Sequence, residues 1–281
     1  MPPGVRLDEK TAASCALTSW GDRLYVAWTG SDLHLNLAFW LEGQELAGKQ
    51  RLAQRSYTWV DDSSSGEDRR RKVVGMAPSV VGIGGQLFLA WTGSDGALNV
   101  LVADSAGYSP PVTFKQRSPL SPTVAAAPDG DLVLAWTGTD RHVNLLTVGR
   151  QWQGQPVRLE AKTSASPALC SHDDNLVVAW TGTDRHINLL TVGRQWQGRP
   201  VRLEVKTSLA PALCSHDGDL MLAWTGTDRH VNLLTVGGQR QAQPLRLEAK
   251  TSASPALCSQ GGDLTLAWAG SDARLNLARL H

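Results

Sequence analysis

Residues 134–140 read LAWTGTD, and this heptad or a near copy of it occurs six times in the chain of 281 residues. The tryptophan of each copy stands at position 28, 91, 136, 180, 224 or 268, so successive copies are 63, 45, 44, 44 and 44 residues apart. Self-similarity at a fixed period is typical of repeat architectures. The sequence therefore predicts six structural units, of which the first is enlarged.

Each unit contains four short segments that alternate apolar and polar residues or are rich in β-branched residues. In residues 166–208 these segments are PALCSH, NLVVAWTG, HINLLTVG and PVRLEVKT, a pattern that predicts β-strands. Turns such as Asp129-Gly130 and Asp217-Gly218 join the first two segments and suit the positive φ angles of a tight hairpin. We therefore expect an antiparallel meander of four strands in each unit.

A single four-stranded sheet cannot bury both of its faces, whereas radial stacking of six such sheets does so. The sequence therefore predicts an all-β, six-bladed β-propeller that occupies residues 1–281 as one domain. The chain begins with VRLDEKT, which matches the fourth-strand segment VRLEAKT, and it ends on LNLARLH, which matches a third strand. We expect the N-terminal strand to complete the last blade and close the ring, which removes unpaired strand edges.

The long first spacing comes from an insertion at residues 57–75, YTWVDDSSSGEDRRRKVVG. Its serine- and glycine-rich centre predicts a loop. The insertion joins a fourth strand to the next first strand, so it lies on the face that carries the six TG[ST]D turns, which we name the TGTD face. We expect the LEAKTS-type segments with Lys162, Lys206 and Lys250 to surround the central opening of this face.

The bulk composition excludes several classes of protein and partner. The chain is 42% hydrophobic and 19% charged, and 27 Lys and Arg residues oppose 26 Asp and Glu residues, which gives a net charge of +1. No global field attracts it to nucleic acid or to a membrane, and no apolar leader or membrane-spanning run is visible. We expect a cytoplasmic monomer without nucleic-acid or membrane partners.

The side chains that every unit shares are expected to serve the fold. The Asp of each turn and the Asn four residues later suit turns that are held by short polar side chains. Cys170, Cys214 and Cys258 recur at one repeat position, so they are expected to be buried and unpaired. The landmark tryptophans are expected to pack between blades or to line a pocket there, and three of them are candidate ligand contacts: Trp136, Trp180 and Trp224.

Three consecutive units add an Arg-His pair after the turn aspartate. Its members are Arg141, His142, Arg185, His186, Arg229 and His230. Copies on neighbouring blades are too far apart to share one metal ion. Either these residues are exposed loop positions, or they donate hydrogen bonds in a polar pocket that is repeated around the ring.

Two further features are candidates for ligand contact. Trp152 and Trp196 lie in RQWQG segments on the opposite face, where they either cover an apolar edge or offer a ring for stacking on a sugar. In the insertion, Trp59 and Arg69 are candidate ligand contacts. If the protein is an enzyme, we expect the insertion to supply the catalytic acid, base or metal ligand from Asp61, Asp62 and Glu67.

The repeat [LV][AV]AW[TA]G[ST]Dxx[LVI]N[LV] resembles bacterial propellers that are built from near-identical blades. This group is similar both to sialidase-like propellers and to fucose-binding lectins such as that of Photorhabdus. The resemblance to the lectins implies sugar sites between blades that are lined by Trp. The sialidase Asp-box is approached only at residues 104–107, DSAG, and the arginine triad and Tyr-Glu pair of sialidases are not recognisable, so that activity is not implied.

These features favour a lectin-like module that binds carbohydrate at repeated pockets, with a glycan or small molecule as its ligand and no cofactor or metal. Nothing matches a nucleotide-binding loop, a CxxC pair, a nucleophile elbow or an HExxH run. One alternative is a hydrolase, lyase or cyclase with a single central pocket on the TGTD face, covered by residues 57–75. A second alternative is a scaffold for protein interactions.

Overall fold

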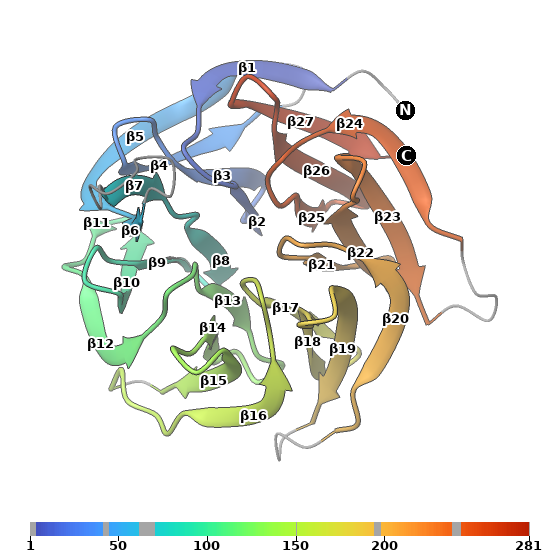
Figure 1. The fold of residues 1–281 in the computed structure, drawn as a ribbon. Coiled ribbons are helices and arrows are strands. Elements are labelled where there is room, and N and C mark those ends of the chain that lie inside the picture. Colours follow the sequence, from blue (N-terminus) through green and yellow to red (C-terminus); the bar gives the residue numbers. More distant parts are fainter. Residues whose placement is uncertain are drawn as a thin grey trace.

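The computed structural model describes residues 4–41, 45–61, 71–149, 151–193, 198–237 and 243–280. Within these ranges the chain forms β-strands and turns without any helix. Six antiparallel sheets of four or five strands stand around a common axis, and a separate two-stranded sheet lies between the first two of them in sequence. The predicted six-bladed β-propeller is confirmed (Figure 1).

The first three blades follow the chain from its N-terminal side. The first contains β2 (Ala16–Trp20), β3 (Arg23–Thr29), β4 (His34–Trp40) and β5 (Leu46–Arg55). The second contains β8 (Ser79–Ile83), β9 (Gln86–Thr92), β10 (Ala97–Asp104), β11 (Gly107–Tyr108) and β12 (Val112–Arg117). The third contains β13 (Thr123–Ala126), β14 (Leu132–Thr137), β15 (His142–Val148) and β16 (Val157–Lys162).

The remaining three blades repeat the same order. The fourth contains β17 (Ala168–His172), β18 (Asn175–Thr181), β19 (His186–Val192) and β20 (Val201–Lys206). The fifth contains β21 (Ala212–His216), β22 (Asp219–Thr225), β23 (His230–Val236) and β24 (Leu245–Lys250). The sixth contains β25 (Ala256–Gln260), β26 (Asp263–Ala269), β27 (Arg274–Leu280) and the N-terminal β1 (Val5–Lys10).

Closure of the ring follows the prediction, because β1 pairs antiparallel with β27 in the sheet of the sixth blade. Thr11, which follows β1, links the sixth blade to the first. Its backbone N–H donates to the Ala273 carbonyl of the sixth blade, and its hydroxyl donates to the Thr29 carbonyl of the first. The two ends of the chain therefore lie in neighbouring strands (Figure 1).

The landmark tryptophans pack between blades, as predicted. Trp136 is 4% exposed and shares one apolar cluster with Val100 of the preceding blade. The neighbouring Thr137 hydroxyl donates a hydrogen bond of 2.9 Å to the carbonyl of Ala165, just before the first strand of the next blade. In the sixth blade Ala269 stands at this position, so that blade lacks the hydroxyl. Apolar burial and one buried hydrogen bond therefore connect most pairs of blades.

The TG[ST]D turns confirm the structural role predicted for Asp and Asn. In the third blade one Asp140 carboxylate oxygen accepts the backbone N–H of His142, and the Asn144 amide donates to the His142 carbonyl. The same two hydrogen bonds occur in all six blades. They leave no room for a side chain at Gly138, where a Cβ atom would lie 2.6 Å from Asp140 Oδ1.

Two expectations about the TGTD face need correction. Residues 57–75 are not wholly a loop, since β6 (Tyr57–Asp61) and β7 (Arg71–Gly75) pair as an antiparallel hairpin. Lys162, Lys206 and Lys250 do not surround the axis, because each ends the outermost strand of its blade. The axial cavity, of about 180 Å³, is lined instead by small residues at the start of the first strands, such as Ser166, Pro167 and Ala168.

The cysteines are free thiols, as predicted. Burial raises the pKa of Cys15 to about 12 and the pKa values of Cys170 and Cys258 to about 11, and it raises the pKa of Cys214 further. A thiol held in its protonated form is a poor nucleophile. These side chains fill the space between the inner strands.

Substitution of the turn glycine tests the repeated turn. We expect Gly138→Ala to lower the free energy of unfolding by about 1–3 kcal/mol, because the new methyl group overlaps the Asp140 carboxylate. Gly85→Ala is the matched control, since a Cβ atom there meets nothing within 4 Å and its φ is not positive. We expect it to change stability by less than about 0.5 kcal/mol. Urea unfolding measures both, and equal effects would contradict this account of the turn.

Thiol labelling tests the burial of the cysteines. At neutral pH we expect a chromogenic disulfide reagent to label none of the four thiols rapidly in the folded protein, because their raised pKa values suppress the thiolate. All four should react after unfolding in denaturant. Rapid labelling of the native protein would show that the inner strands open.

Candidate functional site

Three consecutive junctions between blades contain a cavity at the same position. The cavities lie between the first and second, second and third, and third and fourth blades, with volumes of about 410, 640 and 580 Å³. All three open on the face that carries the connections from third to fourth strands, which we name the RQWQG face. A cavity that recurs at successive junctions is a property of the repeat.

Four strand positions line each cavity, two from each blade of the junction. The earlier blade contributes one residue from its second strand and one from its third, and the later blade does the same. From the first junction to the third these residues are Tyr25, Phe39, Leu87 and Ala103, then Phe88, Val102, Leu132 and Val148, then Val133, Thr147, Leu176 and Val192. The positions are equivalent, but the side chains differ in size and polarity, so the cavities differ in shape.

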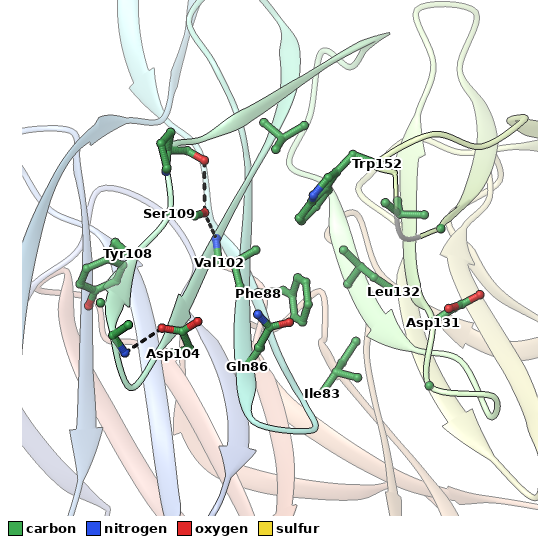
Figure 2. Close-up of a pocket in the computed structure, with 17 residues that line it drawn as sticks. Ile83, Gln86, Phe88, Val102, Asp104, Tyr108, Ser109, Asp131, Leu132 and Trp152 are labelled. Atoms are coloured by element: carbon green, nitrogen blue, oxygen red, sulfur yellow. Dashed lines mark hydrogen bonds between the residues drawn. The ribbon is translucent and has the colours of Figure 1, made fainter.

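The cavity between the second and third blades is the largest of the three, and its aromatic lining residues are Phe88, Tyr108 and Trp152 (Figure 2). The Trp152 ring lies 6.2 Å from the Phe88 ring and 6.4 Å from the Phe114 ring, centroid to centroid. Ile83 and Leu132 complete the apolar wall, and Trp152 remains only partly buried. An aromatic ring that keeps one side open to a cavity is available for stacking on a ligand.

The local sequence RQWQG holds Trp152 over this cavity. Trp152 has a φ of 57°, which is uncommon for a bulky residue, and its N–H donates to the Gly149 carbonyl at 2.9 Å. Gly154 lets the chain return across β15, because a Cβ atom there would lie 2.1 Å from the Thr147 carbonyl oxygen. The turn from Gly149 to Gly154 therefore fixes the position of the Trp152 side chain at the cavity.

Polar groups stand at the mouth of the same cavity. Asp104 uses one carboxylate oxygen to accept the Ala106 N–H at 2.8 Å, and Asp131 and Gln86 are exposed on the other walls. The Ser109 hydroxyl is occupied, since it accepts the Val102 N–H at 3.1 Å and donates to a backbone carbonyl (Figure 2). The site thus combines an apolar floor with a few hydrogen-bonding groups at its rim, which is the usual make-up of a small-molecule site.

The Arg-His pairs lie on the TGTD face, and the two members of each pair differ in exposure. Arg141, Arg185 and Arg229 are exposed in the turns with φ angles of 64°, 67° and 65°. The histidines are not exposed loop residues, because His142, His186 and His230 are only 8%, 7% and 5% exposed at the start of the third strands.

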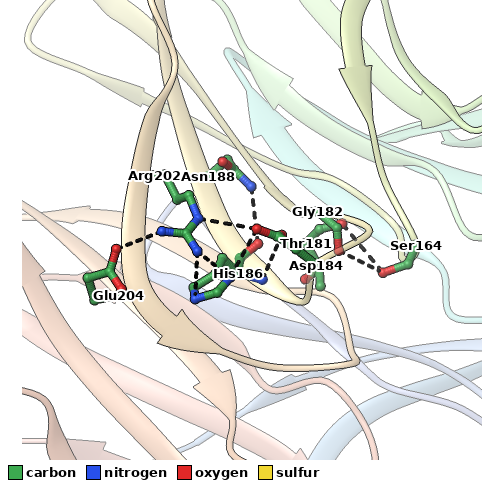
Figure 3. Close-up of polar contacts among 8 residues, drawn as sticks. All are labelled: Ser164, Thr181, Gly182, Asp184, His186, Asn188, Arg202 and Glu204. Atoms are coloured by element: carbon green, nitrogen blue, oxygen red, sulfur yellow. Dashed lines mark hydrogen bonds and ion pairs between the residues drawn. The ribbon is translucent and has the colours of Figure 1, made fainter.

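The side chains of His142 and His186 belong to charged networks, of which Figure 3 shows the copy in the fourth blade, whereas His230 Nδ1 lies 2.9 Å from the Leu247 carbonyl oxygen. His186 Nδ1 lies 3.0 Å from an Asp184 carboxylate oxygen, and the Arg202 guanidinium donates to both Asp184 and Glu204. The His186 backbone N–H and the Arg202 guanidinium hold the pKa of Asp184 below its ordinary value. In the third blade the Arg158 guanidinium, with the His142 N–H, lowers the pKa of Asp140 to about 2.

The remaining predicted residues are dispersed. Trp136, Trp180 and Trp224 are each 4% exposed, and Trp180 borders an open groove of about 760 Å³ that runs along β16 between the third and fourth blades. Trp59 is 51% exposed on β6. The Asp61 side chain, Asp62, Glu67 and Arg69 lie outside the described residues, as does Trp196.

The place of the described hairpin strands bears on the alternative of a single central site. The described part of the β6–β7 hairpin lies to the side of the axial opening in the view down the axis (Figure 1). In the part of the chain that the structure describes, no group of three or more His, Cys, Asp or Glu side chains is arranged to hold a metal ion. The same residues include no helix that is long and apolar enough to cross a membrane.

The sequence indicated part of the cavity and missed the rest. RQWQG singled out Trp152, which does face a cavity. Phe88 and Tyr108 were not selected, since they occur in the diverged second blade and only the register of the strands places them beside Trp152. Their signal in the sequence was the departure from the consensus, where Phe88 replaces the aliphatic Val133 of the third blade.

No family model and no curated protein matches the sequence. Among solved structures, the fold is similar to the SapL1 lectin in complex with α-methyl fucoside, at 10% identity and a TM-score of 0.69, over 97% of this chain and 94% of that chain. It is also similar to the fucose-specific lectin of Aleuria aurantia, at 12% identity and a TM-score of 0.67, over 97% and 93%. A streptogramin B lyase matches at 11% identity and a TM-score of 0.55, over 99% and 87%. At these identities the likenesses show the shared propeller fold.

The pKa of Asp140 gives a testable pH dependence. The pKa is lowered in the folded state because the ionised Asp140 carboxylate accepts hydrogen bonds from Arg158 and from the His142 N–H. These hydrogen bonds stabilise the protein above about pH 4, and their contribution is lost as the pH falls toward 2. In Arg158→Gln we expect the carboxyl of Asp140 to titrate closer to its ordinary value of 3.8, as followed by NMR. Lys162→Gln, which removes a cation that does not pair with Asp140, is the control, and an equal shift there would contradict the assignment to Arg158.

Proposed function

We propose that this protein is a multivalent carbohydrate-binding module whose sites are the cavities between blades on the RQWQG face. The single observation that carries this proposal is the recurrence of a cavity, lined by equivalent strand positions, at three consecutive junctions. An enzyme needs one reactive site, whereas a lectin gains from several weak ones. Binding at several sites raises the avidity for a multivalent target without any new contact.

The chemistry of the second cavity suits a sugar ring. Pyranosides present a face of C–H groups that stacks on an aromatic ring, and Trp152 offers such a ring at the cavity mouth. Their hydroxyl groups need hydrogen-bond partners, which Asp104, Asp131 and Gln86 supply from the rim. Phe88 and Val102 make the floor apolar, so a deoxy sugar that places a methyl group there is favoured over a fully hydroxylated one.

The structural neighbours indicate which sugar to test first. SapL1 is seen with α-methyl fucoside and the Aleuria lectin is named as specific for fucose, and fucose is a deoxy sugar with a methyl group. An apolar floor such as that formed by Phe88 and Val102 favours a methyl group over a hydroxyl group. We therefore propose a fucoside as the ligand class, on the cavity chemistry together with these neighbours, and the resemblance to Photorhabdus-type lectins stays a prediction.

Titration with α-methyl fucoside tests the proposal. We expect calorimetry to show weak binding of more than one sugar per chain, and Trp152→Ala to weaken the site between the second and third blades by about 1 kcal/mol or more, since the stacking ring is lost. A fucosylated polymer should bind far more tightly than the free sugar, and it should lose avidity in the variant.

Trp59→Ala is the matched control, because it removes another partly exposed indole on the opposite face. It should leave sugar binding unchanged. Absence of binding by any monosaccharide or glycan at millimolar concentration would overturn the proposal. Binding that persists unchanged in Trp152→Ala would place the site elsewhere on the molecule.

A further inference from the structure

The TGTD face carries a cation at the end of the fourth strand in every blade. The six residues are Lys10, Arg55, Arg117, Lys162, Lys206 and Lys250, and all are exposed. In the third, fourth and fifth blades a second exposed cation stands in the adjoining turn, at Arg141, Arg185 or Arg229. The two positions are neighbours, because the N–H of Thr163, which follows Lys162, donates to the Arg141 carbonyl at 2.8 Å.

The acidic side chains of these three blades do not neutralise the added cations. In the third blade Asp140 and Glu160 both pair with Arg158. Among the described residues, no carboxylate lies within ion-pair distance of Arg141 or Lys162, and the same holds for Arg185, Lys206, Arg229 and Lys250. Three cations against two carboxylates leave a charge of +1 on this part of each blade. The result is a cationic arc over half of the ring.

The β6–β7 hairpin adds exposed apolar side chains on the TGTD side of the ring, with Trp59 on one face of the hairpin and Val60 and Val74 on the other. Trp59, Val60 and Val74 are 51%, 47% and 39% exposed, and Arg71 and Lys72 are exposed beside them on β7. The base of the hairpin is fixed by Ser56, whose N–H donates to the Leu33 carbonyl. This bond is the counterpart of the one from Thr163 to Arg141, which places the hairpin on the face of the cationic arc.

We propose that the TGTD face docks on an anionic lipid bilayer. The arc supplies long-range attraction to acidic headgroups, and each Lys or Arg near such a surface adds to the affinity. The exposed indole of Trp59 suits the boundary between headgroups and hydrocarbon, and Val60 and Val74 add exposed apolar surface on the other face of the same hairpin. A nucleic-acid backbone would satisfy the cations, but it offers no counterpart for two exposed valines.

The orientation that follows separates the two faces of the protein. The cavities open on the RQWQG face, so a molecule docked by its TGTD face presents them away from the bilayer. Glu160 and Glu204 have side chains that are 87% and 82% exposed on the docking side. These carboxylates moderate the attraction, and docking is therefore expected to be reversible and sensitive to salt.

Vesicle sedimentation tests this inference with the intact chain. We expect binding to vesicles of phosphatidylcholine with phosphatidylserine at low ionic strength, no binding to phosphatidylcholine alone, and release as NaCl is raised. The combined substitutions Lys162→Gln, Lys206→Gln and Lys250→Gln should weaken binding on the order of a hundredfold, and Lys206→Gln alone about fivefold. Trp59→Ala should weaken it with little change in salt dependence.

Arg199→Gln is the matched control for Lys206→Gln, since it removes an exposed cation from the RQWQG side of the same blade and should leave vesicle binding unchanged. Equal loss in both variants, or no binding to acidic vesicles at low salt, would overturn the proposal. Tighter binding to duplex DNA than to the vesicles would also overturn it and assign the arc to nucleic acid. Trp152→Ala should bind vesicles normally, so failure of sugar binding and failure of docking are distinguishable.

Discussion

Burial of the landmark tryptophan between neighbouring blades is the interaction on which the rest of the structure depends. A four-stranded sheet exposes two apolar faces, and only the next blade covers them. Trp136 lies in one apolar cluster with residues of the preceding blade, while Thr137 donates across the junction to the following one. The same contacts recur along the ring, so only the pairing of β1 with β27 is still needed to close it. This pairing covers the β27 edge of the sixth blade, which would otherwise be unpaired.

The repeated turn explains why the most prominent motif of the sequence is not the site. Asp140 Oδ1 and the Asn144 amide bond the backbone of the turn, and Gly138 makes room for both side chains. The function that we propose belongs instead to positions that the repeat leaves free to vary. Phe88 and Val133 share one register position, yet one makes an aromatic cavity wall and the other an aliphatic one.

We propose a different role for each face of the ring. A net charge of +1 predicts no membrane partner, but that sum hides the arrangement of the charges. Asp140 and Glu160 converge on Arg158, which leaves Arg141 and Lys162 outside the pairing. Electrostatic attraction to a surface depends on the local excess of positive charge within about a Debye length rather than on the net charge of the whole chain. The cations and the Trp59 hairpin lie on one face, and the cavities open on the other.

The sequence by itself determined the six blades, their four strands, the closure and the buried tryptophans, because period-two alternation and a 44-residue repeat specify local pairing directly. It also marked Trp152 through RQWQG. Only the tertiary structure decided which residues meet between blades, since Phe88 and Trp152 are 64 residues apart and contact through packing of separate sheets. It likewise converted a predicted loop into the β6–β7 hairpin and buried His142, because cross-strand register and side-chain charge pairing are properties of the assembled ring.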